Sequence, residues 1–408
     1  MDTISMRIIG KDKYTIAPYA PFVPEFSVRK FSDLSSGERN RNNGRIPYLR
    51  HFVLHAESTD GLRLPQVEIF EVADWETLSV VYEMKITTSL PNLVFENNLE
   101  EFDFADPELK KQVTGTLSER LAGVGIGVRP WNISLAPLSV LHIAKNIPLH
   151  SSIKMRRLLT TLSKTDAGKA FDVTDGSDFA RMKNRNDGRV VNIRSGTREW
   201  AFYDKIEDSL RPKSKRFDKS KNERAKELIG LHDLENTEVF RFEYRLNKAQ
   251  TIRSEVNKIL KREYQTPVTF GDIFSKELCK TILLNAWKTL INRPENQPVL
   301  FAGDNRLELL LHILTKAHDR DKSAHSQNLA LWSYGLATVI MDHGAKTLKH
   351  EMGKVWSSKA GERLEEKIAT AVALAKEIPL SDDIMFISNA LRKFERYVPG
   401  ETPKDHEE

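Results

Sequence analysis

The sequence predicts an α+β fold, in which an antiparallel sheet with helices on one face is followed by an all-helical C-terminal part. Up to about residue 265, many segments are rich in β-branched and aromatic residues, and several alternate apolar with polar positions. After Pro267 the apolar residues follow a helical repeat, as at Phe270, Phe274 and Leu278. The 408 residues allow two or three domains. We predict domains over residues 1–265 and 266–400 and a disordered acidic tail over 401–408.

Eight segments of the first domain are predicted to be strands. They are "DTISMRII", "YLRHFVLHA", "PQVEIFEV", "LSVVYEMKITTSL", "LSVLHIAKNI", "GRVVNIR", "REWAFYDK" and "EVFRFEYRL". Two helices are expected between them. The segment "DPELKKQVTGTLSERLAGVG" begins at an Asp-Pro cap and ends in glycines, and "SSIKMRRLLTTLSK" follows Pro148.

The second domain consists of segments with helical periodicity. They are "VTFGDIFSKELCKTILLNAWKTLI", "NRLELLLHILTKAH", "NLALWSYGLATVIMDHG", "GAKTLKHEMGKVW", "AGERLEEKIATAVALAKEI" and "LSDDIMFISNALRKFERYV". Within them, "LATVIMDHGAKTLKHEMGKVW" has the pattern of a helix-turn-helix with Gly344 near the turn.

The composition excludes several classes of protein. Lysine and arginine exceed aspartate and glutamate by 62 − 57 = 5, so any argument about partners depends on where the charges lie. Cys279 is the single cysteine, which excludes an intrachain disulfide and a cysteine-based zinc cluster and indicates a reducing, cytoplasmic setting. The sequence has no apolar signal core, no segment long enough to span a membrane, and no nucleotide-binding or serine-hydrolase motif. We expect a soluble cytoplasmic protein.

Three of the predicted strands carry rows of polar side chains. Alternation places these residues on one face of each strand: His142, Ala144 and Asn146; Arg241, Glu243 and Arg245; Tyr203, Lys205 and Glu207. If the three strands pair in one sheet with helices behind their apolar rows, the polar rows meet on one open face. Each row taken alone has an ordinary structural explanation. The row of Arg241 fits a solvated surface, His142 fits a histidine in the core, and Tyr203 fits a packed aromatic residue.

Such a face would suit phosphodiester chemistry. Tyr203 would be the nucleophile that takes over a DNA 5′ phosphate, although its usual pKa of about 10 makes it weak without help. Lys205 would offset charge on the phosphate. We expect His142 and Glu243 to share a divalent metal, with Glu207 as a third ligand. Nitrogen and oxygen ligands without thiolate favour Mg²⁺ or Mn²⁺.

Further cations are candidates for contacts with DNA. The segment "SLRPKSKRFDKSKNERAK" is strongly basic, and it fits either a solvated linker or a flap that contacts phosphates. The predicted DNA-binding residues are Arg211, Lys213, Lys215, Arg216, Arg241 and Arg245.

Several segments together resemble a known family. These are "MDTISMRI", "KITTSLPNLVFENNLEEFD", "LSVLHIAKNIPL", "FYDKIED", "VFRFEYRLNKAQTIRSEV" and "TFGDIFSKELCKTILLNAWKTL". They resemble, in order from residue 1 to about 290, the phage and plasmid replication initiators of the gene II/X type. That group is similar in turn to the replication initiation factor family, which includes staphylococcal plasmid initiators.

The resemblance implies rolling-circle replication initiation, in which one strand is nicked at an origin, held through a phosphotyrosine and later rejoined. The tyrosine and lysine of the family's Tyr-x-Lys motif match Tyr203 and Lys205. The acidic residue of the "RFE" strand matches Glu243, and a metal-binding polar residue matches His142, although this strand lacks a His-hydrophobic-His pair. The implied partners are single-stranded and duplex origin DNA, a host helicase and polymerase, and a second copy of the chain, with no membrane.

Two other functions remain open at this stage. The chain could be a non-catalytic protein that binds an origin through its helical part, or a structural protein whose polar rows are plain surface. Tyr203→Phe separates them, because it removes a covalent DNA adduct only if the enzyme interpretation holds.

Overall fold

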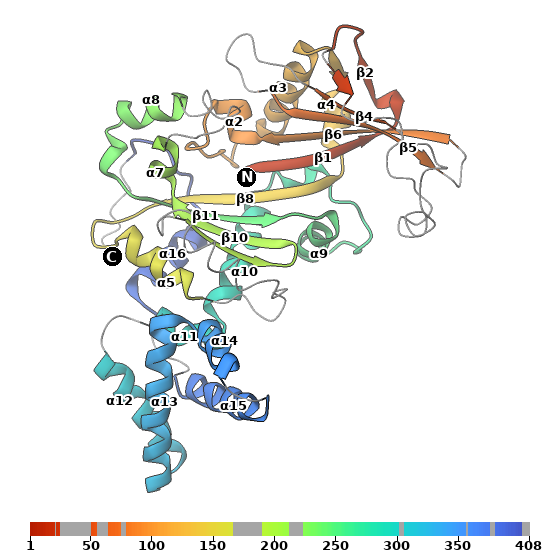
Figure 1. The fold of residues 1–408 in the computed structure, drawn as a ribbon. Helices are drawn as coiled ribbons and strands as arrows, with labels where there is room; N and C mark the ends of the chain where they lie inside the picture. The colour runs from red at the N-terminus through yellow and green to blue at the C-terminus, as the bar shows by residue number, and fades with distance from the viewer. Residues whose placement is uncertain are drawn as a thin grey trace.

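The computed structural model describes residues 1–20, 22–24, 50–54, 64–74, 79–165, 190–211, 223–301, 306–355, 358–375 and 380–401. It shows a mixed α/β protein built on a large antiparallel sheet (Figure 1). Within the described residues the sheet has nine strands in the order β3-β4-β5-β6-β1-β8-β11-β10-β9. They are β1 (Thr3–Ile9), β3 (Phe22–Pro24), β4 (Arg50–Leu54), β5 (Gln66–Asp74), β6 (Ser79–Ser89), β8 (Leu138–Pro148), β9 (Val190–Ser195), β10 (Arg198–Asp204) and β11 (Val239–Leu246).

The eight predicted strands are confirmed, because each of those segments contains a strand of this sheet. The sequence did not predict three strands of three residues each: β3, and the pair β2 (Tyr14–Ile16) and β7 (Ile126–Val128), which forms a second small sheet. Strands this short carry too few side chains for alternation to appear.

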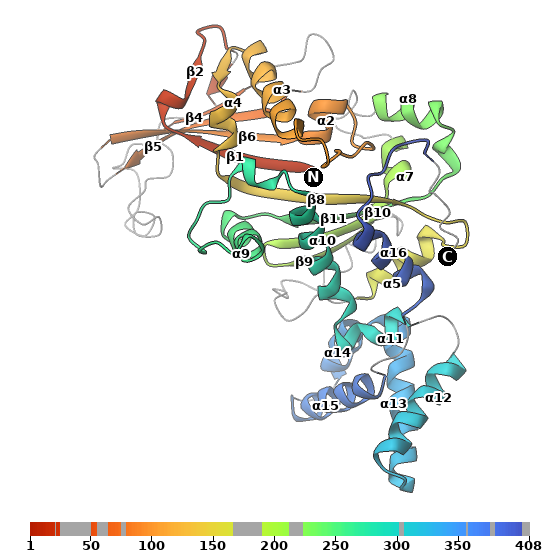
Figure 2. The same cartoon turned by 180° about the vertical axis from the view of Figure 1, so that it is seen from behind.

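One face of the large sheet is apolar and is covered by helices. Phe202 and Phe242 stack with ring centroids 5.1 Å apart, and Trp287 of α10 packs against both rings. The helices that share this core are α3 (Leu109–Gly123), α5 (Met155–Ser163), α9 (Ala249–Leu260), α10 (Lys276–Ile291) and α16 (Asp382–Lys393). Figure 2, seen from behind, shows α10 and α16 in front of the strands. The opposite face keeps the polar rows.

From Phe270 onward the described residues form helices. The longer ones besides α10 and α16 are α12 (Arg306–Arg320), α13 (Ala324–His343), α14 (Ala345–Val355) and α15 (Ser358–Leu374), with the short α11 (Gln297–Leu300) before them. Residues of these five helices pack into two small cores, although Leu300 of α11 belongs to the core of the sheet. The five helices lie together below the sheet in Figure 1. The domain boundary at residue 266 stays a prediction, since α10 and α16 belong to the core of the sheet.

The expected helix-turn-helix segment does form two helices. They are α13 and α14, and they meet at Gly344, whose φ of 81° suits glycine. A Cβ there would lie 2.6 Å from the carbonyl oxygen of Lys164, at the end of α5. Because Gly344 has no Cβ, the junction of α13 and α14 can lie directly against the end of α5.

The strand predicted through Glu207 is wrong beyond Asp204. There β10 ends and α7 (Lys205–Leu210) begins, because Oδ1 of Asp204 accepts hydrogen bonds from the backbone N–H groups of Ile206 (2.9 Å) and Glu207 (3.2 Å). Lys205 and Glu207 therefore do not continue the row of Tyr203. The chain goes on into α8 (Glu223–Leu231).

Some expectations lie outside the described residues. These are the contacts of Lys213, Lys215 and Arg216 and the disordered tail from residue 402. In the described part of the chain, the helices are all too short or too polar to cross a bilayer.

Candidate functional site

The register of three neighbouring strands brings the polar rows together. Strand β11 lies between β8 and β10, and its residues face partners on both sides. The groups of three, in the order β8, β11, β10, are Asn146, Arg241 and Tyr203; Ala144, Glu243 and Ala201; His142, Arg245 and Glu199. The expected meeting of polar rows on one face is therefore found, with Glu243 at its centre between two alanines.

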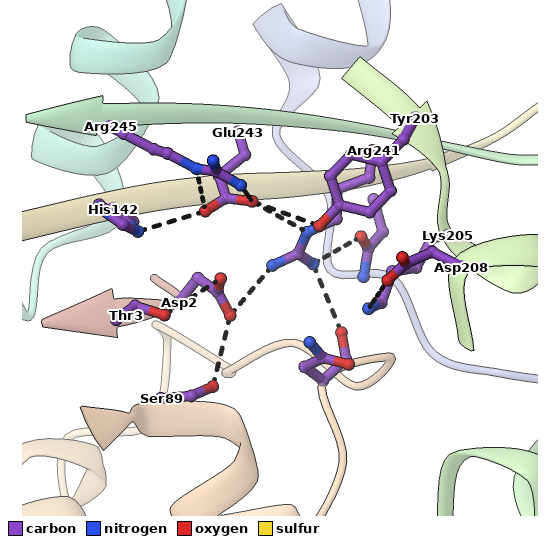
Figure 3. Close-up of polar contacts among 12 residues, drawn as sticks. Asp2, Thr3, Ser89, His142, Tyr203, Lys205, Asp208, Arg241, Glu243 and Arg245 are labelled. Atoms are coloured by element: carbon purple, nitrogen blue, oxygen red, sulfur yellow. Dashed lines mark hydrogen bonds and ion pairs between the residues drawn. The ribbon is translucent and has the colours of Figure 1, made fainter. Parts of the chain in front are cut away.

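Glu243 is the hub of the cluster (Figure 3). Arg245 donates two hydrogen bonds to it, from Nε to Oε1 (2.9 Å) and from Nη2 to Oε2 (3.1 Å). Nδ1 of His142 lies 3.4 Å from Oε1, and Nε of Arg241 lies 3.9 Å from Oε2. Burial alone would raise the pKa of the Glu243 carboxyl, but His142, Arg241 and Arg245 lower it well below its usual value. Glu243 is thus a buried, charged carboxylate.

Tyr203 points into this cluster. Its hydroxyl donates a hydrogen bond to Oε2 of Glu243 at 3.3 Å, and the residue is only 9% exposed. Burial raises the pKa of the phenol well above its usual value; Arg241 opposes this effect and Glu243 adds to it. The phenol is therefore protonated and enclosed in this arrangement.

Arg241 is held from several elements at once. Its Nη1 donates to Oδ1 of Asn146 (2.9 Å), and its Nη2 lies 3.1 Å from Oδ1 of Asp2. Burial lowers the pKa of a guanidinium, but Tyr203, Asp2 and Glu243 outweigh burial and raise it. Arg241 is therefore a fixed positive charge beside Tyr203.

A second layer of contacts holds Asn146. Its side chain donates to the carbonyl oxygen of Leu99 (2.9 Å), and its backbone N–H donates to Oε1 of Glu101 (2.6 Å). Oε2 of Glu101 also accepts from Lys145 and from the backbone N–H of Tyr397 (3.0 Å). The segment after α16 is thus tied to the strand that carries part of the site.

The other predicted residues lie near the cluster but not in it. Lys205 is 1% exposed, with Nζ 5.9 Å from the ring centroid of Tyr203 and 3.9 Å from Oδ2 of Asp208. Glu207 lies on α7, where Oε1 is 3.8 Å from Nη2 of Arg211. Arg211 follows the end of α7.

The predicted metal ligands do not fit a divalent cation as they stand. Among the described residues no group of three or more histidine, cysteine, aspartate or glutamate side chains is placed to share an ion. His142 and Glu243 are close together, but the carboxylate already faces two guanidinium groups, whose charge would repel a cation. Glu207 is paired elsewhere.

The sequence missed two members of the cluster. Glu199 accepts from Nη1 of Arg245 at 3.1 Å, and two steps of two residues back from Tyr203, through Ala201, would have found it. Asp2 gave no local signal, because its role depends on a strand that lies far away in the sequence.

Models of known families, curated proteins and solved structures were all compared with this chain, and none of them matches it.

Proposed function

We propose that this protein nicks one DNA strand at a specific site, keeps the 5′ phosphate on Tyr203, and later rejoins the strand. The observation that supports this most is the hydrogen bond from the Tyr203 hydroxyl to Glu243, with Arg241 and Arg245 on the same carboxylate. A nucleophile, a proton acceptor and two cations for a phosphate then lie within one small cluster. The resemblance to rolling-circle initiators points to an origin of replication as the DNA.

The chemical step uses these groups in a definite order. The phenol oxygen of Tyr203 bonds to phosphorus, its proton passes to Glu243, and the bond from phosphorus to the 3′ oxygen breaks. The released 3′ oxygen takes a proton from water. Attack of a 3′ hydroxyl on the phosphotyrosine reverses the step and reseals the strand, so no external energy source is required.

The low proton affinity of Glu243 is compatible with this role only when a phosphate is present. Arg241 and Arg245 lower the pKa of that carboxyl in the free protein, together with His142. A phosphate that accepts hydrogen bonds from the guanidinium groups partly neutralises their positive charge, so they lower the pKa of Glu243 less. Glu243 then becomes a better base at the moment when the nucleophile must lose its proton. Because Tyr203 is enclosed, a DNA strand can react with it only after the polar face of the sheet has opened.

A covalent adduct is the direct test. The full chain, incubated with a library of single-stranded origin sequences, should give a protein–DNA species that survives denaturation and whose mass maps to Tyr203. Tyr203→Phe should remove the adduct and leave DNA binding and folding almost unchanged. Tyr264→Phe is the matched control, because Tyr264 is 43% exposed and lies in the turn that follows the end of α9. An adduct that persists in Tyr203→Phe, or one that maps to Tyr264, would refute the assignment.

A second candidate function is DNA binding without catalysis. It is favoured by the helix pair α13 and α14, joined at Gly344, with the cations Lys349 and Lys354 on exposed positions of α14. The same experiment separates the two functions. Sequence-specific binding by the wild-type chain with no adduct under any condition would favour the binding protein.

A further inference from the structure

Asp2 lies inside the polar cluster, although it comes before the first strand. Its backbone N–H donates to the carbonyl oxygen of His142 (3.0 Å), and its own carbonyl oxygen accepts from the backbone N–H of Leu90 (2.7 Å). Its side chain is 9% exposed, and Figure 3 shows the carboxylate pointing toward Arg241. The backbone of Asp2 is therefore fixed on both sides, which fixes the direction of the carboxylate.

The guanidinium of Arg241 is enclosed, yet its donors are only partly used. Nη1 donates to Oδ1 of Asn146 (2.9 Å). Oδ1 of Asp2 lies 3.1 Å from Nη2 and balances the charge, but within the described structure neither Nη2 nor Nε makes a hydrogen bond of good geometry. Buried donors without partners are costly in a folded protein. Their presence here indicates that they are kept for a ligand that accepts hydrogen bonds.

The two unused donors are close to the proposed nucleophile. Arg241 lies directly opposite Tyr203 in the pairing of β10 with β11. Its Nε is 3.9 Å from Oε2 of Glu243, the same atom that accepts the hydrogen bond from the Tyr203 hydroxyl. A guanidinium presents such donors to two oxygens of one phosphate. A phosphate bound there would lie beside the phenol oxygen.

We infer that Asp2 is a positioning residue, which holds Arg241 so that Nε and Nη2 bind two non-bridging oxygens of the phosphodiester that Tyr203 attacks. The inference rests on the proposed function. Asp2 itself does not touch the phosphate and acts through Arg241. Its negative charge repels the phosphate, whereas its contact orients the guanidinium. Loss of that charge should therefore slow the reaction without weakening the binding of the phosphate.

The variant Asp2→Asn in the full chain tests whether the reaction slows without a loss of binding. The rate of adduct formation with a single-stranded oligonucleotide is measured with Tyr203 present. The Kd for the same oligonucleotide is measured in a Tyr203→Phe background, in which no reaction takes place. We expect the rate to fall by about tenfold or more, while the Kd stays the same or decreases. Arg241→Gln should lower the rate and raise the Kd, and the double variant should react no more slowly than Arg241→Gln alone.

Two further variants separate positioning from damage to the fold. Ser89→Ala removes the hydroxyl that donates to Oδ1 of Asp2 (3.5 Å) and should give the same pattern on a smaller scale. Asp12→Asn, an exposed aspartate before β2, should change neither quantity. Thermal unfolding of each variant shows whether it is folded, and Ser89→Ala decides the question if Asp2→Asn does not fold.

The outcomes also distinguish this inference from the proposed function. A wild-type rate in Asp2→Asn, or rate losses of Asp2→Asn and Arg241→Gln that multiply in the double variant, would overturn the inference and leave the nicking mechanism in place. If the wild-type chain forms no adduct, the nicking mechanism fails, but the Kd values still test whether Asp2 positions Arg241 for a phosphate. Binding weakened by Arg241→Gln but not by Asp2→Asn would support the inference, and equal Kd values throughout would overturn it.

Discussion

The two halves of the polar face of the sheet carry similar residues but arrange their charges in different ways. On β1, β5 and β6, carboxylates pair with cations that reach solvent: Arg7 pairs with Glu83 (2.7 Å) and Lys85 with Glu68 (2.7 Å). The side chains of Arg7 and Lys85 are 38% and 29% exposed. Their carboxylates are more enclosed, with the side chains of Glu83 and Glu68 8% and 13% exposed, but in each pair the cation reaches solvent.

On β8, β11 and β10, several charges converge on one buried carboxylate. Glu243 is 3% exposed and faces Arg241, Arg245 and His142. Burial of charge is costly unless it is balanced, so this half must be held together by groups from outside the three strands, among them Asp2 and Glu101. Alternating polar residues occur in both halves, whereas the convergence of buried charges distinguishes β8, β11 and β10.

The largest difference between the halves should appear in stability. Glu243→Gln leaves Arg241 and Arg245 without their common partner, so we expect the free energy of unfolding to fall by about 3 kcal/mol. Glu83→Gln on the other half should cost about 0.5 kcal/mol, because Arg7 can turn to solvent. Urea unfolding of both variants measures this, and equal losses would mean that the two halves do not differ.

A smaller effect is expected where the C-terminal segment joins the site. Glu101→Gln replaces an acceptor of three hydrogen bonds by an amide, so at least one of the donors Lys145, Asn146 and Tyr397 loses its partner. We expect a loss of about 2 kcal/mol and faster tryptic cleavage after Arg396. Exposed Glu96 gives the matched control, Glu96→Gln, and cleavage at the wild-type rate in Glu101→Gln would show that this contact does not hold the segment.

The smallest effect depends on pH. Burial raises the pKa of Asp204 to about 6 against an unfolded value of 3.8, although hydrogen bonds from Glu207 and Ile206 act the other way. Because the folded state holds the proton more tightly, Asp204 contributes stability at low pH that is lost as the pH rises toward 6. Asp204→Asn keeps the cap without the charge, so its advantage over wild type should grow from near zero at about pH 4 to about 1 kcal/mol above pH 7.

The control for this pH dependence is Asp321→Asn. Asp321 is exposed, and hydrogen bonds from Ser323 lower the pKa of its carboxyl, so this variant should not gain stability as the pH rises. Unfolding of both variants across this range measures the difference. An advantage of Asp204→Asn that does not change with pH would show that burial does not control this carboxyl.

Much of the fold could be predicted from local patterns. Alternation predicted eight strands of the large sheet, and on β8, β10 and β11 it placed Asn146, Tyr203 and Glu243 on the same face. The prediction failed where two local signals competed. "WAFYDKIE" alternates throughout, but Asp204 followed three residues later by Glu207 is also a helix start, and the cap prevailed.

The rest of the site could not be predicted from one sequence, because it depends on contacts between distant segments. Asp2 reaches Arg241 only because β1 and β8 are neighbours at the centre of the sheet. Nothing near Asp2 in the sequence identifies that partner. The burial of Lys205, a residue that alternation placed in a solvated row, likewise follows from the packing of α7 against the sheet.

The bond between Glu101 and Tyr397 has a consequence for the synthesis of the chain on the ribosome. These residues are 296 positions apart, so the contact closes a very long loop and forms late. The strands of the sheet can pair while the helical part is still being translated. The surroundings of Asn146 are completed only after residue 397 has emerged, so a nascent chain carries Tyr203 in an unfinished site while almost 200 further residues are translated.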